Sequence, residues 1–144
     1  MKTKPFDPSL HDRYDSPGRQ IVKEYITNKL HLTVKDNPDI YGVDLIIYKE
    51  NKIVGYAEVE VRNNWSSDAF PYEILNVPYR KKKLLENNKP TFFFSVNKPQ
   101  TRMFCCTAEI VLESELKENP NKCVKSNEYF YKIPVSKLKL IEIV

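Results

Sequence analysis

The sequence predicts a single α/β domain whose core is a mixed β-sheet flanked by helices. Its 144 residues are enough for one hydrophobic core and too few for two ordinary domains. Hydrophobic residues make up 41% of the chain and aromatic residues 12%, which is a globular composition. Segments with helical periodicity alternate along the chain with short apolar runs bounded by Asn, Pro and Lys, a pattern typical of helices and strands in one mixed fold.

The first predicted helix follows a polar arm. Residues 1–15 contain two prolines and are expected to be irregular. Ser16 and Pro17 then predict a helix start, because a hydroxyl caps the first turn and proline at the first helical position gives up no hydrogen bond. The helix is expected to reach Leu30 and to pack on the sheet. Its apolar stripe consists of Ile21, Val22, Tyr25 and Ile26.

The stretch Tyr41–Trp65 predicts a β-hairpin around which the rest of the fold is organised. A short strand is expected just before it, at Leu32–Val34. Apolar residues 43–47 form the first strand of the hairpin and polar residues 49–52 form its turn. Residues 54–61 then alternate between the two faces of the second strand.

Three acidic residues interrupt the apolar strands of this hairpin. A turn centred on Asn51 pairs residues that are equally distant from it, so Asp44 is expected beside Glu58. Glu58 and Glu60 point to the same face, about 6.5–7 Å apart. Alternating acids often line only the solvated face of a sheet, but aspartate is disfavoured in strands, which favours a site. Because partly buried carboxylates repel one another, the cluster predicts a hard divalent cation, Mg²⁺ or Mn²⁺.

This arrangement of acids resembles the PD-(D/E)XK nuclease superfamily, whose members hydrolyse phosphodiester bonds with bound Mg²⁺. The resemblance spans about residues 16–94 and implies a restriction-endonuclease-like fold in which Asp44, Glu58 and the carbonyl of Val59 hold the metal. Glu60 stands where most members have a lysine that orients or activates the attacking water. A minority branch is similar in using Glu-x-Glu, which implies that Glu60 is a general base or an additional metal ligand.

The same resemblance implies further site residues. Many members carry an acid on the first helix that reaches the metal, and Glu24 is the matching residue. It lies on the flank of the apolar stripe, where a solvated glutamate is also expected. Rearranged sites in this superfamily bring the missing cation from another element, and the candidates here are Arg62, Arg80 and Lys81.

A basic segment follows the hairpin. Residues 79–87 predict a helix that begins with consecutive cations, after a short extended piece at residues 74–77. Such a run is often a solvated helix face, yet cations beside an acidic metal site also suit the phosphates of nucleic acid. The net charge of +4 is compatible with a polyanionic partner. The predicted nucleic-acid contacts are Arg62, Arg80, Lys81 and Lys82.

Two aromatic residues between the hairpin and the basic segment leave two interpretations open. Trp65 and Tyr72 either stack on nucleic-acid bases or hold the loop against the core. The order of Trp65, Phe-Pro-Tyr at 70–72 and Pro-x-Arg-Lys-Lys at 78–82 is similar to a subgroup of small viral or phage-type proteins in the same superfamily.

The second half of the chain is predicted to complete the sheet. Thr91–Val96 is a continuous apolar run, typical of a central strand buried on both faces, and Arg102–Ala108 returns as the next strand. A short helix is expected at Glu109–Leu116, a polar loop at Lys117–Asn127 and a strand at Tyr129–Ile133. The last residues predict a helical turn followed by an extended segment.

The cysteine, histidine and hydropathy patterns indicate the cellular environment that the sequence fits. Cys105 and Cys106 are adjacent and Cys123 is isolated, so reduced thiols in a cytoplasmic setting are the simpler interpretation. His11 and His31 are isolated and expected at the surface. Neither a membrane-spanning apolar run nor a signal-peptide pattern is present in the sequence, which predicts a soluble protein.

Together these features predict a metal-dependent endonuclease that hydrolyses phosphodiester bonds in nucleic acid, with DNA favoured over RNA as substrate. Pairing into a homodimer is left open. An alternative is a catalytically inactive nuclease-like fold that binds nucleic acid or protein, because the motif lysine is absent. A third interpretation is a metal-free α/β interaction domain whose acids only decorate the surface.

Overall fold

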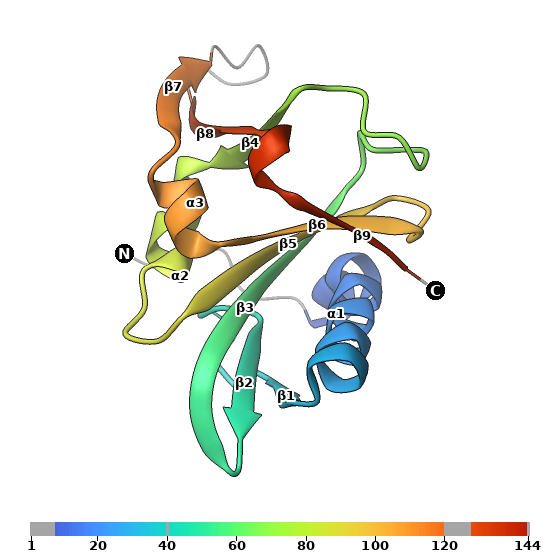
Figure 1. Cartoon of the computed structure of the whole chain (residues 1–144), viewed down its shortest axis with the longest axis vertical. Coiled ribbons are helices and arrows are strands. Elements are labelled where there is room, and N and C mark those ends of the chain that lie inside the picture. Colours follow the sequence, from blue (N-terminus) through green and yellow to red (C-terminus); the bar gives the residue numbers. More distant parts are fainter. Residues whose placement is uncertain (1–7, 40, 120–127, 144) are drawn as a thin grey trace.

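The protein, analysed as a computed structural model that describes residues 8–39, 41–119 and 128–143, has an α/β fold with a mixed sheet flanked by helices (Figure 1). The six-stranded sheet has the order β1 (Thr33–Asp36), β2 (Leu45–Lys49), β3 (Lys52–Arg62), β5 (Thr91–Asn97), β6 (Arg102–Thr107) and β9 (Lys139–Glu142). A three-stranded sheet has the order β4 (Ile74–Pro78), β8 (Glu128–Pro134) and β7 (Glu115–Asn119). The helices are α1 (Pro8–Leu30), α2 (Lys82–Leu85) and α3 (Ala108–Leu112), with 3-10 turns at Tyr79–Lys81 and Val135–Lys137.

The predicted hairpin is confirmed as β2 and β3. Its turn places Glu50 and Asn51 at φ 53° and 66°, the left-handed conformation that two-residue hairpin turns require. Leu45 pairs with Ala57. Asp44 precedes Leu45 and is therefore level with Glu58, as predicted. The turn alone does not set this register, because it pairs Lys49 with Lys52 and a bulge between Ile47 and Tyr48 then shifts the pairing by one residue.

The six-stranded sheet separates two hydrophobic clusters. Val59 packs with Val22 and Ile26 of α1 on one face. On the other face, Phe93 packs with Leu75 of β4 and with residues of β8, α2 and α3. Because β3 and β5 are parallel and Glu58 is level with Phe93, Glu58 lies on the face opposite α1. The acidic residues of β3 are therefore covered by the small sheet and the basic segment, on the side of the sheet away from α1 (Figure 1).

The prediction that α1 begins at Ser16 is wrong, because the helix already begins at Pro8. Residues 8–15 of the predicted arm are therefore helical, and residues 1–7 lie outside the described residues. Pro17 sits inside the helix, where it removes one backbone hydrogen bond at a cost of about 3 kcal/mol. The next residue, Gly18, packs so closely that an added Cβ would lie 2.7 Å from Val61.

The second half differs from the prediction mainly in the small sheet. The expected helix at 79–87 is a 3-10 turn followed by the four-residue α2, and the expected loop at 117–127 begins within β7. Residues 120–127, including Cys123, lie outside the described residues. The sequence of β7, ELKEN, is polar and largely exposed, so it lacks the apolar alternation that predicts a strand. No helix in the described part of the chain is long and apolar enough to cross a membrane.

Candidate active site

Glu58 is a buried carboxylate paired with a lysine from another element. Its side chain lies near the middle of β3 and the residue is 3% exposed. Lys81 donates from Nζ to Glu58 Oε2 at 2.6 Å, and the lysine side chain is only 19% exposed. The 3-10 turn that follows Pro78 directs Lys81 toward the sheet. The structure thus brings together an acid of the hairpin and one of the three candidate replacement cations.

The two partners shift each other's pKa values. Burial, and after it Asp44, raise the pKa of Glu58 to about 7, while Lys81 opposes the rise. Burial alone would lower the pKa of Lys81, but Glu58 above all, together with Glu60 and Asp44, raises it above its ordinary value. Lys81 therefore stays charged at neutral pH, and it only partly compensates the pair formed by Glu58 and Asp44.

Asp44 and the backbone of Val59 complete the site at the end of the β2–β3 ladder. Asp44 Oδ2 accepts a hydrogen bond from the Val59 N–H at 2.8 Å. The N–H and C=O of one strand residue face the same neighbouring strand, so the Val59 carbonyl lies on the edge where Asp44 approaches. Glu58 Oε1 is buried and has no hydrogen-bond partner. Two carboxylates, one of which has an unpartnered buried oxygen, and a backbone carbonyl form a donor set that suits a hard divalent cation.

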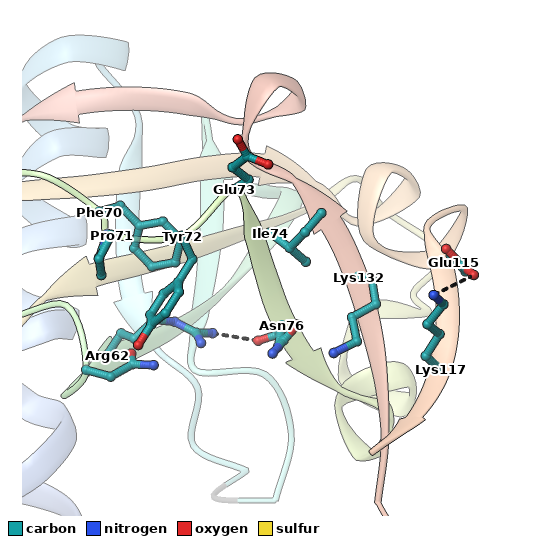
Figure 2. A pocket seen from close by; sticks show the side chains of 11 residues that line it. Arg62, Phe70, Pro71, Tyr72, Glu73, Ile74, Asn76, Glu115, Lys117 and Lys132 are labelled. Atoms are coloured by element: carbon teal, nitrogen blue, oxygen red, sulfur yellow. Dashed lines mark hydrogen bonds and ion pairs between the residues drawn. The ribbon is translucent and has the colours of Figure 1, made fainter.

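Glu60 belongs to a different network on the same face of β3. Its Oε2 accepts hydrogen bonds from Arg62 and, at 2.8 Å, from Ser95 Oγ. Arg62 also donates to the Asn76 carbonyl at 2.7 Å (Figure 2). Across residues 8–39, 41–119 and 128–143, no three His, Cys, Asp or Glu side chains gather to hold a metal. The expected cluster of three carboxylates is therefore reduced to Asp44 and Glu58, because Arg62 and Ser95 hold Glu60.

The structure does not bring Glu24 to this site. Glu24 is on α1, across the sheet from Glu58, and accepts a hydrogen bond from Gln20 at 3.3 Å. It lines a separate small cavity with Met103 and Ile141. An acid on the flank of an amphipathic helix is solvated in this way without any functional role.

Arg80 and Lys82 contact acidic residues other than those of the hairpin. Arg80 is 70% exposed at its side chain and lies 3.4 Å from Glu128. Lys82 Nζ lies 5.8 Å from the centre of the Tyr79 ring and 4.0 Å from Glu86. Consecutive cations on a short helical turn face different directions, so only Lys81 of these three contacts Glu58.

The two aromatic candidates have different surroundings. Trp65 is fully buried and stacks on Phe104 with ring centroids 4.7 Å apart, so it is a core residue. Tyr72 is 54% exposed at the rim of an open cavity. Sequence reasoning missed Ser95, a fully buried hydroxyl in the apolar strand β5. Its position within the run TFFFSV was the signal, because a buried polar residue needs a partner.

Comparisons with known proteins found limited similarity. No protein-family model matches the chain, and no curated protein matches it. Among solved structures, the chain is similar to a nuclease from a fusselovirus, with 15% sequence identity, a TM-score of 0.45, and coverage of 94% of this chain and 92% of the other. At this identity and TM-score, the chemistry of the chain has to be inferred from its own side chains.

Proposed function

We propose that the protein is a metal-dependent nuclease that hydrolyses phosphodiester bonds, with Asp44, Glu58 and the Val59 carbonyl as ligands of Mg²⁺ or Mn²⁺. The observation that carries this proposal is the state of the Glu58 carboxylate. One oxygen is 2.6 Å from Lys81 Nζ, and the other is buried and has no hydrogen-bond donor. The neighbouring acid Asp44 raises the pKa of Glu58, so a bound cation would relieve both the unsatisfied oxygen and the repulsion between the two carboxylates.

Lys81 takes the role that the motif lysine has in the superfamily that the sequence resembles. Position 60 holds a glutamate, and the cation reaches Glu58 from the turn after β4 instead of from β3. A divalent ion bound to this donor set supplies positive charge for the transition state and makes a water molecule more acidic. Lys81 adds a fixed ammonium group beside the same carboxylate, where it can orient a phosphate oxygen or the attacking water.

Glu60 is proposed as a positioning residue. Its carboxylate is held by Arg62 and Ser95, so it lacks the freedom that a general base requires. The proposed substrate is nucleic acid, because a divalent cation on these ligands and the ammonium group of Lys81 would both match phosphate chemistry. DNA is the first substrate to test, and RNA is the parallel one.

The test is cleavage of labelled single-stranded and duplex DNA and RNA with Mg²⁺, with Mn²⁺ and with chelator. We expect cleavage only with metal, and a loss of at least about 100-fold in Glu58→Gln and in Asp44→Asn. Glu24→Gln is the matched control, since this acid lies across the sheet. Circular dichroism verifies that each variant is folded. Cleavage that persists in folded Glu58→Gln, or that needs no metal, contradicts the proposal.

A further inference from the structure

A cavity of about 830 Å³ lies between the loop before β4 and the outer face of the small sheet (Figure 2). In β4 and β8 the buried residues Leu75 and Ile133 alternate with residues that face outward. The outward residues form the floor of the cavity, where Asn76 is level with Lys132 and Lys132 with Glu115. The volume is within the range of ligand-binding pockets in proteins.

Arg62 connects this cavity to the candidate active site. The same guanidinium binds Glu60, donates to the Asn76 carbonyl and lines the cavity. Glu58 and Arg62 are four residues apart on β3, which corresponds to about 13 Å along the strand. The cavity therefore begins at Arg62, about 13 Å along β3 from Glu58.

Tyr72 offers an aromatic surface at the rim of the cavity. It extends from the loop toward the end of the cavity where Arg62 lies (Figure 2). Phe70 packs edge-on against it with ring centroids 5.6 Å apart, so the ring is held although it is 54% exposed. A fixed, exposed ring is the platform on which an unpaired base stacks.

Lys132 supplies the charge on the floor. Two other cations that line the cavity are already compensated, Arg62 by Glu60 and Lys117 by Glu115 at 3.5 Å. Lys132 has no ion pair with any described residue, and its Nζ lies 5.8 Å from the centre of the Phe130 ring. An ammonium group without an acidic partner on a cavity floor suits a phosphate.

We infer that this cavity binds unpaired nucleotides of a nucleic-acid strand next to the proposed cleavage site, with Tyr72 stacking on a base and Lys132 contacting a phosphate. Placing the cavity beside a scissile bond rests on the proposed function, whereas strand binding itself does not. In a duplex, both faces of a base are covered by its neighbours, so a stacking platform selects single strands, flaps or loops.

The test is fluorescence anisotropy of labelled oligonucleotides with the full chain in chelator, so that no cleavage occurs. Single-stranded DNA, single-stranded RNA of the same sequence and duplex DNA are compared. We expect Tyr72→Ala to weaken single-strand binding about 10–100-fold, and Tyr72→Phe to restore it. Tyr129→Ala is the matched control, since Tyr129 is 49% exposed on β8 but does not line the cavity.

The charge is tested in the same assay. Lys132→Glu is expected to weaken binding at least about 10-fold and to flatten its salt dependence. Lys52→Glu changes the net charge equally at the exposed tip of the β2–β3 hairpin, and it should leave affinity within about 2-fold. A higher affinity for single-stranded DNA than for single-stranded RNA, or the reverse, identifies which nucleic acid the cavity binds.

The outcomes separate this inference from the proposed function. If Tyr72→Ala and Lys132→Glu bind like their controls, or if duplex binds more tightly than single strands, the inference is wrong even when Glu58-dependent cleavage is found. If cleavage never appears while both cavity variants lose affinity, the cavity remains a single-strand site and the nuclease proposal fails.

Discussion

Glu58 and Glu60 lie two residues apart on the same face of β3, yet they are compensated in different ways. Glu60 is satisfied by an arginine from its own strand and by a buried hydroxyl of β5. Glu58 shares one oxygen with a lysine from a distant turn and leaves the other buried and unpartnered. Compensation of charge, rather than position in a motif, therefore separates a structural carboxylate from a candidate ligand.

The largest expected effect comes from removing the charge of Lys81, the residue paired with Glu58. Lys81→Met keeps the length of the side chain and removes its charge beside the carboxylates. Metal-dependent cleavage should fall by about 100–1000-fold, the usual result of removing one charged group from a catalytic site. Arg80→Met removes the neighbouring exposed cation and should leave the rate within about 3-fold. Equal losses in the two variants would mean that the basic segment acts only by general attraction.

The next effect concerns metal binding. Calorimetric titration of Mn²⁺ should detect a site that Asp44→Asn abolishes, while Glu60→Gln weakens it by no more than about 10-fold because Glu60 is held by Arg62. Mn²⁺ should raise Tm more at pH 8 than at pH 6, since the metal competes with the proton on Glu58, whose pKa is about 7. Binding that survives Asp44→Asn but is lost in Glu60→Gln would reverse the roles of the two glutamates.

Stability without metal should depend on pH through Glu58. Burial and Asp44 raise its pKa from 4.5 to about 7, so the folded state binds more protons than the unfolded state between these values. The contribution is present below about pH 4.5 and is lost as pH rises through 7, which amounts to about 3 kcal/mol. Lys81 does not cancel this slope, because its raised pKa acts only above its ordinary value of 10.5.

Asp44→Asn checks this assignment. The amide oxygen can still accept the Val59 N–H, while the negative charge beside Glu58 is gone. Urea denaturation from pH 4.5 to 8 should therefore show a shallower loss of stability than in the wild type. A Glu60→Gln variant should keep the wild-type slope. If Glu60→Gln instead flattens the dependence of stability on pH, the titrating carboxylate is that of Glu60 and not that of Glu58.

The hairpin was predictable because it depends on local rules, the alternation on both strands and the polar turn between them. Equal spacing from Asn51 gave the correct pairing of Asp44 with Glu58, but the structure reaches it through a bulge between Ile47 and Tyr48 that the sequence did not indicate. The partners of the two glutamates are not local. Lys81 is 23 residues from Glu58 and Ser95 is 35 residues from Glu60, so their contacts exist only after β4 and β5 have packed on β3.

In the small sheet, β4 and β8 match the extended segments predicted at residues 74–77 and 129–133, whereas β7 was missed. This strand is polar and mostly exposed, and it becomes a strand only by pairing with β8. Pro17 led to a different error, because it placed the predicted start of α1 too late in the chain. Proline at a helix start is the common case, whereas here the helix begins nine residues earlier, at Pro8, and continues through Pro17.

The smallest expected effect tests whether Glu60 is a structural carboxylate. Ser95→Ala removes the hydroxyl that donates to Glu60 Oε2 at 2.8 Å and accepts from Arg62 Nε at 3.3 Å. Because Arg62 still neutralises Glu60, the expected loss is about 1 kcal/mol of unfolding free energy, measured by urea denaturation. The Mn²⁺ affinity and the cleavage rate should stay within about 3-fold of the wild type. A loss of cleavage as large as that of Lys81→Met would place Glu60 and Arg62 inside the catalytic centre, and Glu58 and Glu60 would then act as one unit.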